Sequence, residues 1–134
     1  MRKKVSVLLV CLLLLSLSQV VLAAGETDQI IKTESTSKTF ILCSATISTS
    51  SKNIVCKTKS VLKETAPQSI TMYLQKKNGN SWTTVAQWRK STTDDNLVFS
   101  KTYSKSPGTY RVKGKHTAHR ESEYSYSSSK TVSK

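Results

Sequence analysis

The chain has 134 residues, and its 21 Lys and Arg against eight Asp and Glu give a formal net charge of +13. This length suits one domain with a single core, and the positive charge favours adhesion to polyanions. The four glycines form no phosphate-binding loop, and no Gly-x-Ser-x-Gly nucleophile elbow occurs. We therefore expect a protein that is not an enzyme, uses no cofactor and has no specific affinity for nucleic acid.

The first 24 residues have the pattern of a secretory signal peptide. Three basic residues at 2–4 precede an apolar run from Val5 to Leu15, and the small residues Ala23 and Ala24 precede a polar segment. This apolar run is too short to span a bilayer, which needs about 20 residues. The pattern predicts cleavage after Ala23 or Ala24 and a secreted protein without a transmembrane segment, which is either soluble or held to the cell wall by noncovalent contacts alone. Cleavage leaves 18 basic and eight acidic residues, a net charge of about +10.

After a polar arm at Gly25–Thr39, the sequence from Phe40 to Lys134 has the composition of β-strands. Ser, Thr, Val, Tyr and Ile dominate, the hydrophobic period is two, and no helical stripe is present. This predicts an all-β domain, a seven-stranded antiparallel β-sandwich of the immunoglobulin or fibronectin-III kind. The expected strands are Phe40–Ser48, Asn53–Val61, Ser69–Lys77, Ser81–Arg89, Leu97–Ser104, Thr109–Ala118 and Tyr124–Val132.

Cys43 and Cys56 are the two cysteines that follow the leader. A hairpin closed through Ser48–Ser51 would place Cys43 directly opposite Cys56, and opposed residues of an antiparallel pair are close enough for a disulfide. Export of a small domain also favours oxidation. We therefore expect a Cys43–Cys56 disulfide, and the alternative is two buried free thiols.

The dipeptide Asn78-Gly79 predicts a two-residue type I′ hairpin turn. Strict pairing about this turn places Tyr73, Trp82 and Trp88 on the outward face of the sheet, where aromatic rings can stack on sugar rings. In the competing interpretation a bulge turns Trp88 inward and Trp82 folds over the rim, since tryptophan is highly buried on average.

The strand expected at Thr109–Ala118 carries the densest basic feature. Tyr110 follows a Ser-Pro-Gly turn, as the tyrosine does at the corner of immunoglobulin-like folds, and faces inward. Alternation then places three cations outward. These cations are either a binding surface or a solvated outer face, and they are Arg111, Lys113 and Lys115.

The two histidines and the acidic turn make poor metal sites. His116 and His119 point to opposite faces of a strand, and Asp94-Asp95-Asn96 lacks the spaced ligands of a calcium loop. We therefore expect no metal ligand and no catalytic residue.

Three segments carry a family resemblance. They are Ser69–Val85, with its Tyr-Leu-Gln and Asn-Gly-Asn-Ser-Trp motifs, Tyr110–His116 and Glu121–Ser128. Together they resemble a family of small exported proteins from Gram-positive bacteria, each made of a leader and one domain. The resemblance extends from about Cys43 to Val132. It implies an exported β-sandwich without an established activity, so no site residue is carried over from it.

These features together predict a secreted, monomeric, cationic binding module. Its expected partner is an anionic cell-wall polymer or polysaccharide. The candidate binding residues are Arg111, Lys113, Lys115, Lys76 and Lys77, with Tyr73 and Trp82 as stacking surfaces. The alternative function is a secreted antibacterial protein that acts on competitors' membranes, and a third is a structural matrix component.

Overall fold

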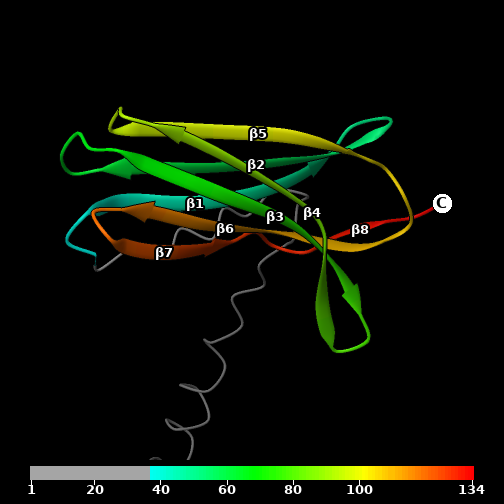
Figure 1. Ribbon diagram of the computed structural model, residues 1–134. Helices are drawn as coiled ribbons and strands as arrows, with labels where there is room; N and C mark the ends of the chain where they lie inside the picture. The colour runs from blue at the N-terminus through cyan, green and yellow to red at the C-terminus, as the bar shows by residue number, and fades with distance from the viewer. Residues whose placement is uncertain (1–36) are drawn as a thin grey trace, which may run out of the picture.

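The computed structural model describes residues 37–134, so the predicted leader and the arm up to residue 36 lie outside the described residues. The described fold is all-β, as predicted, and consists of two antiparallel sheets. The smaller sheet has the order β1-β2-β5, and the larger has the order β4-β3-β6-β7 with β8 also paired to β6 (Figure 1). The strands are β1 (Phe40–Thr49), β2 (Asn53–Leu62), β3 (Gln68–Asn78), β4 (Ser81–Thr92), β5 (Asn96–Ser104), β6 (Gly108–Ala118), β7 (Glu121–Tyr126) and β8 (Lys130–Val132).

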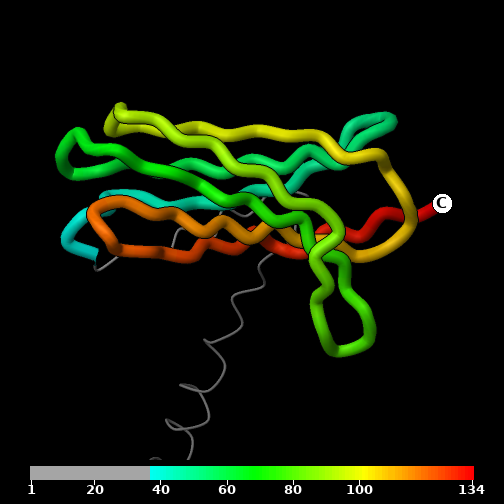
Figure 2. The backbone as a smooth tube through the Cα atoms, in the orientation of Figure 1, coloured from blue at the N-terminus to red at the C-terminus, as the bar shows by residue number. Residues whose placement is uncertain are grey.

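The two sheets pack face to face, and the connections between strands gather at the two ends of the resulting sandwich. The β2–β3, β4–β5 and β6–β7 connections lie at one end, and the β1–β2 and β5–β6 connections lie at the other (Figure 2). The tip of the β3–β4 hairpin projects away from both layers (Figure 1). This arrangement leaves the outward face of each sheet accessible.

The final predicted strand, Tyr124–Val132, is divided in two at Ser127. The Ser127 N–H donates to the Val112 carbonyl at 2.9 Å, and the Val112 N–H donates to Ser127 Oγ at 2.8 Å. A side-chain hydroxyl thus replaces a backbone acceptor, which is how serine commonly competes with a strand ladder. The chain therefore continues as the separate strand β8, and the prediction of seven strands is corrected to eight.

Inward-facing side chains of both sheets form the interior. The main apolar cluster includes Ala45, Ile47, Ile54, Cys56, Ile70, Met72, Leu74, Tyr110 and Val112. A smaller cluster near the start of β1 contains Phe40, Cys43, Leu62, Ala66 and Ala118. Buried polar side chains are paired, as buried polar groups usually are: Ser60 with Gln68 and His116 with Ser125.

Tyr110 fixes the start of β6. Its side chain is 1% exposed, and its hydroxyl donates to the Ser106 carbonyl at 3.1 Å and pairs with Ser106 Oγ at 2.6 Å. This contact ties β6 to the connection that precedes it.

The predicted Cys43–Cys56 disulfide is wrong, because the β1–β2 hairpin closes later than expected. The Ser50 N–H donates to the Asn53 carbonyl at 2.8 Å, and the Asn53 N–H donates to Ser50 Oγ at 3.2 Å. This turn pairs Cys43 with Ser60 and Cys56 with Ile47. The two cysteines share the inward face but stand four residues apart in register, about 13 Å along the strand. A disulfide requires Cα atoms within about 7 Å, so both thiols are free.

The β3–β4 turn also differs from the prediction. Asn78 pairs with Ser81, so Gly79 and Asn80 are the central residues, and Gly79 has a φ of 60°. Glycine at the first central position is typical of a type II′ turn rather than type I′.

A β-bulge at Val85 decides where the second tryptophan lies. Gln75 pairs with Thr84 and Leu74 pairs with Ala86, which leaves Val85 without an opposite residue. One extra residue reverses the facing of the strand beyond it. Trp88 therefore lies opposite Met72 and packs against the core, as in the bulged alternative, instead of facing outward.

The β6–β7 turn uses the left-handed backbone conformation without glycine. Ala118 pairs with Glu121, and the two central residues, His119 and Arg120, have φ values of 47° and 64°. Positive φ at both central positions is the type I′ geometry, which costs roughly 1–2 kcal/mol per non-glycine residue.

We expect the Arg120→Gly variant to be about 1 kcal/mol more stable than the native protein, because glycine adopts positive φ without a Cβ clash. Urea unfolding at constant pH measures the change. The Arg120→Ala variant is the matched control, since it removes the same charge but keeps the Cβ. Equal stability of the two variants would mean that charge, not backbone conformation, is responsible.

We expect both thiols to resist alkylation in the folded protein. Burial raises the pKa of Cys43 and of Cys56 to about 12, with the charge of Glu123 adding to the effect at Cys43. Thiolates are the reactive species, so iodoacetamide should label neither cysteine at neutral pH until denaturant is added. Mass spectrometry should then show both modified. Failure to label the denatured, unreduced protein would reveal a disulfide and contradict the register of β1 and β2.

Candidate functional site

The outward face of the five-stranded sheet collects cations and aromatic rings. On β6, Arg111, Lys113 and Lys115 alternate with buried residues, as predicted, so their side chains leave the opposite side of the sheet. They lie about 7 Å apart along the strand, the distance of two residues. The side chains that each cation contacts come from the strands around β6.

Arg111 is held between two aromatic side chains. Its guanidinium carbon lies 4.4 Å from the ring centroid of Trp82 and 4.9 Å from that of Tyr126. Its Nε–H donates to Gln75 Oε1 at 2.9 Å, and Gln75 is 9% exposed. The planar guanidinium has five N–H donors, and the contact with Gln75 occupies one of them. The contacts therefore orient the side chain and leave donors for a ligand.

Lys113 stands among three tyrosines. Its ammonium nitrogen lies 4.9 Å from the ring centroid of Tyr124, 5.7 Å from that of Tyr73 and 5.9 Å from that of Tyr126. Each distance falls within the range of a cation–π contact, worth about 0.5–1 kcal/mol at an exposed site. Tyr126 touches both Lys113 and Arg111, so the two cations share one aromatic neighbour. We call Trp82, Arg111, Tyr126, Lys113, Tyr73 and Tyr124 the cation–aromatic ladder.

The remaining predicted site residues lie at different places. Lys115 shares the outward face with Lys113 and pairs with Tyr124 on β7. Lys77 is exposed at the projecting hairpin, opposite Trp82. Lys76 is separated from this face, because the alternation of β3 directs it to the other side, where its nitrogen lies 5.7 Å from the Tyr110 ring. The structure thus brings Arg111, Lys113, Tyr73 and Trp82 together and leaves Lys76 apart.

Two members of the ladder were missing from the sequence-based site. Tyr124 and Tyr126 are 45% and 38% exposed, and both face outward from β7. The alternation Tyr124-Ser125-Tyr126 beside a strand with three outward cations was the available signal. Their position next to β6 depended on the β6–β7 turn, whose two central residues are not the usual turn dipeptides.

No side-chain carboxylate of residues 37–134 belongs to the outward face. Glu121 and Glu123 pair with the inward-facing residues Ala118 and His116. The other three carboxylates of this range, Glu64, Asp94 and Asp95, lie between strands. The cations of the ladder therefore contact neutral aromatic rings and the amide of Gln75, which leaves their charge available to an external anion.

His116, considered above as a metal ligand, is a core residue. Its side chain is fully buried, its Nε2 pairs with Ser125 Oγ at 2.7 Å, and its Nδ1 has no hydrogen-bond partner in the described part of the chain. A Cβ at Gly114 would stand 2.7 Å from both Nε2 and that Oγ, so glycine makes room for the pair. His119 lies in the exposed β6–β7 turn.

Residues 37–134 contain no group of three or more His, Cys, Asp or Glu that could hold a metal ion. Over the same residues, no helix is long and apolar enough to cross a membrane. Comparison with protein-family models, with curated proteins and with solved structures gives no match to the chain.

We expect stability to fall as the pH drops from about 6.5 to about 4, because burial lowers the pKa of His116 to about 4 from its ordinary 6.5. In this window the unfolded chain binds a proton that the folded chain does not, so lower pH favours unfolding. The full loss is about 3 kcal/mol, and it is complete below both pKa values. Urea unfolding at a series of pH values measures it.

The His116→Gln variant provides the control for this prediction. Whatever its absolute stability, it lacks the titrating group and should show a much flatter profile between these two pH values. Hydrogen bonds from Ser37 and Thr39 lower the pKa of Glu121 below its ordinary 4.5, so Glu121 affects stability only near and below that value. An unchanged profile in the variant would assign the pH dependence to another group.

Proposed function

We propose that the protein is an exported, noncatalytic binding module for an anionic polymer that contains sugar rings. The single observation that supports this most is the cation–aromatic ladder, in which Arg111 and Lys113 lie on an accessible sheet face among four aromatic rings. The net positive charge and the predicted signal peptide agree with an extracellular, polyanionic partner.

The ladder offers the two kinds of contact that such a polymer needs. The flat faces of Trp82, Tyr73 and Tyr124 suit the apolar C–H faces of sugar rings. Arg111 and Lys113 suit carboxylate or phosphate groups, and the guanidinium fork of Arg111 matches the geometry of such anions. Because Gln75 and two aromatic rings already orient Arg111, a ligand loses less entropy in ordering it.

We also infer that the sandwich is of the fibronectin-III kind. In such domains strands A, B and E form one sheet and strands C′, C, F and G form the other. The orders β1-β2-β5 and β4-β3-β6-β7 correspond to these two sheets. The hydrogen bond from Tyr110 to the Ser106 carbonyl supports the inference, because a tyrosine at the start of strand F makes this corner contact. Domains of this fold serve many functions, so the fold adds no functional argument.

We expect the double variant Arg111→Gln with Lys113→Gln to bind an anionic polysaccharide at least ~10-fold more weakly than the native protein, because two charge-assisted contacts are lost. Calorimetry with polygalacturonate, poly(glycerol phosphate) and neutral dextran measures binding and separates carboxylate from phosphate recognition. Native binding should also weaken strongly at ~0.5 M salt.

The matched control is Lys57→Gln with Lys59→Gln. These two lysines lie on β2 in the other sheet, so the control removes the same charge from a face without the ladder. Equal losses in both double variants would show unspecific attraction and contradict a defined site. Dye leakage from anionic vesicles, without binding to either polymer, would favour the antibacterial alternative instead.

A further inference from the structure

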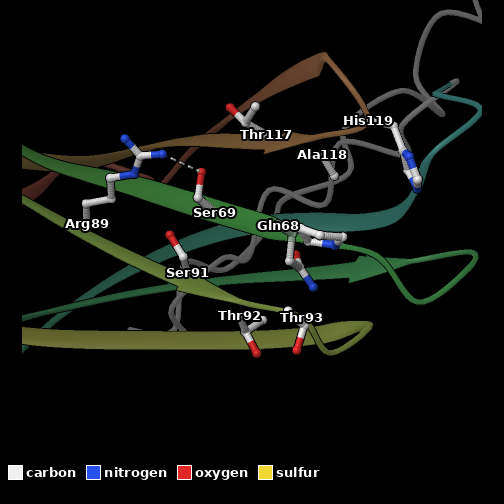
Figure 3. A pocket seen from close by; sticks show the side chains of 10 residues that line it. Gln68, Ser69, Arg89, Ser91, Thr92, Thr93, Thr117, Ala118 and His119 are labelled. Atoms are coloured by element: carbon white, nitrogen blue, oxygen red, sulfur yellow. Dashed lines mark hydrogen bonds between the residues drawn. The ribbon is translucent and has the colours of Figure 1, made fainter.

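A hollow lies on the five-stranded sheet at the end that holds the β2–β3, β4–β5 and β6–β7 connections (Figure 3). Its volume is about 520 Å³. Five of its ten lining residues carry a hydroxyl group, one carries a guanidinium and one an imidazole, and Pro67 and Ala118 are apolar. The other lining residues are Gln68, Ser69, Arg89, Ser91, Thr92, Thr93, Thr117 and His119.

The hollow is continuous with the cation–aromatic ladder. Ser91, Ser69 and Thr117 form one cross-strand row over β4, β3 and β6, and the next row toward the ladder contains Arg89 and Lys115. Both rows lie on the same outward face. Arg111 and Thr117 are six residues apart on β6, so the ladder and the hollow together extend about 20 Å. A short oligosaccharide lying along β6 would contact both.

The hollow is preformed. Buried Gln68 accepts a hydrogen bond from Ser60 Oγ, and its Nε2 donates to the Asp94 carbonyl at 2.7 Å, which holds the β4–β5 connection in place. The Asp94 N–H donates to Thr92 Oγ1 at 3.2 Å within the same connection. Side chains fixed in this way lose little entropy when a ligand binds.

The chemistry of the lining suits a sugar that carries one anionic group. Arg89 Nη2 donates to Ser69 Oγ at 3.4 Å, a long contact that leaves the other guanidinium donors for a carboxylate or phosphate (Figure 3). The hydroxyls of Ser69, Ser91 and Thr117 can each donate and accept, as recognition of sugar hydroxyls requires. Pro67, which is exposed, provides apolar surface for the face of the ring.

The excess of positive charge on the outward face of the five-stranded sheet ends at the hollow. Thr93 and His119 line its far side, and four of the five carboxylates of residues 37–134 occur in or beside the connections there. These four are Glu64, Asp94, Asp95 and Glu121. The same region contains three cations, Lys38, Lys63 and Arg120, so it has no excess of positive charge. A polyanion that follows the cations of β6 would therefore gain nothing by continuing past the hollow.

We propose that the hollow binds the terminal anionic sugar of the polymer, so that the protein recognises chain ends rather than internal segments. This inference rests on the proposed function, because the ladder would bind the units that adjoin the terminal one. It predicts a fixed number of bound proteins for each polymer chain, whatever the length of the chain.

The test uses oligogalacturonates and polygalacturonates of increasing length, with sedimentation velocity to count the proteins bound per chain at saturation. The count should stay constant as the chains lengthen. The Ser91→Trp variant, which fills the hollow from β4, should bind all lengths at least ~10-fold more weakly. Ser100→Trp, at an exposed serine of β5 in the other sheet, is the matched control and should bind as the native protein does.

Two outcomes would overturn the inference while leaving the proposed function intact. One is a count of bound proteins that grows with chain length, which shows binding at internal segments. The other is native affinity in the Ser91→Trp variant while the Arg111 and Lys113 double variant is impaired. Loss of the proposed function would look different, because neither the native protein nor any variant would then bind the polymers.

Discussion

The candidate site depends on the strict alternation of side chains along β6. Tyr110, Val112 and His116 enter the interior, and each is flanked by a residue that leaves on the other side. A slip of one residue would bury Arg111 and Lys113 and expose the core positions, at a large cost for unpaired buried charges. The core of the sandwich therefore holds the cations on one face. Neighbouring strands can then surround these cations with aromatic rings.

This alternation also explains why the site is made of so few residue types. A side chain on the outward face of a sheet contacts mainly the side chains beside it on the two adjoining strands. Trp82 and Tyr126 reach Arg111 from opposite sides, because β4 and β7 are the outermost strands on the two sides of β3 and β6. The row of hydroxyl groups at the end of this face consists of Ser91, Ser69 and Thr117, which lie near the ends of β4, β3 and β6.

Much of the fold could be predicted because strand formation is a local property. The all-β class, most strand positions and the facing of β6 follow from a period of two and from turn residues. Register was harder, since it depends on which residue closes each turn. Ser50 and Asn53 close the first hairpin later than expected and so separate the two cysteines. The bulge at Val85 has no distinct sequence signal, yet it places Trp88 on the core side.

By itself, the sequence determined which residues are cationic, where apolar and polar residues alternate, and that the described chain folds into strands. Charge and periodicity are properties of single residues and of their order along the chain. Only the tertiary structure decided which residues meet. Tyr124 and Tyr126 reach Lys113 through the β6–β7 turn, and the hollow combines residues of β3, β4 and β6 with three connections. Such contacts arise from sheet order and register, which bring together positions that are distant in sequence.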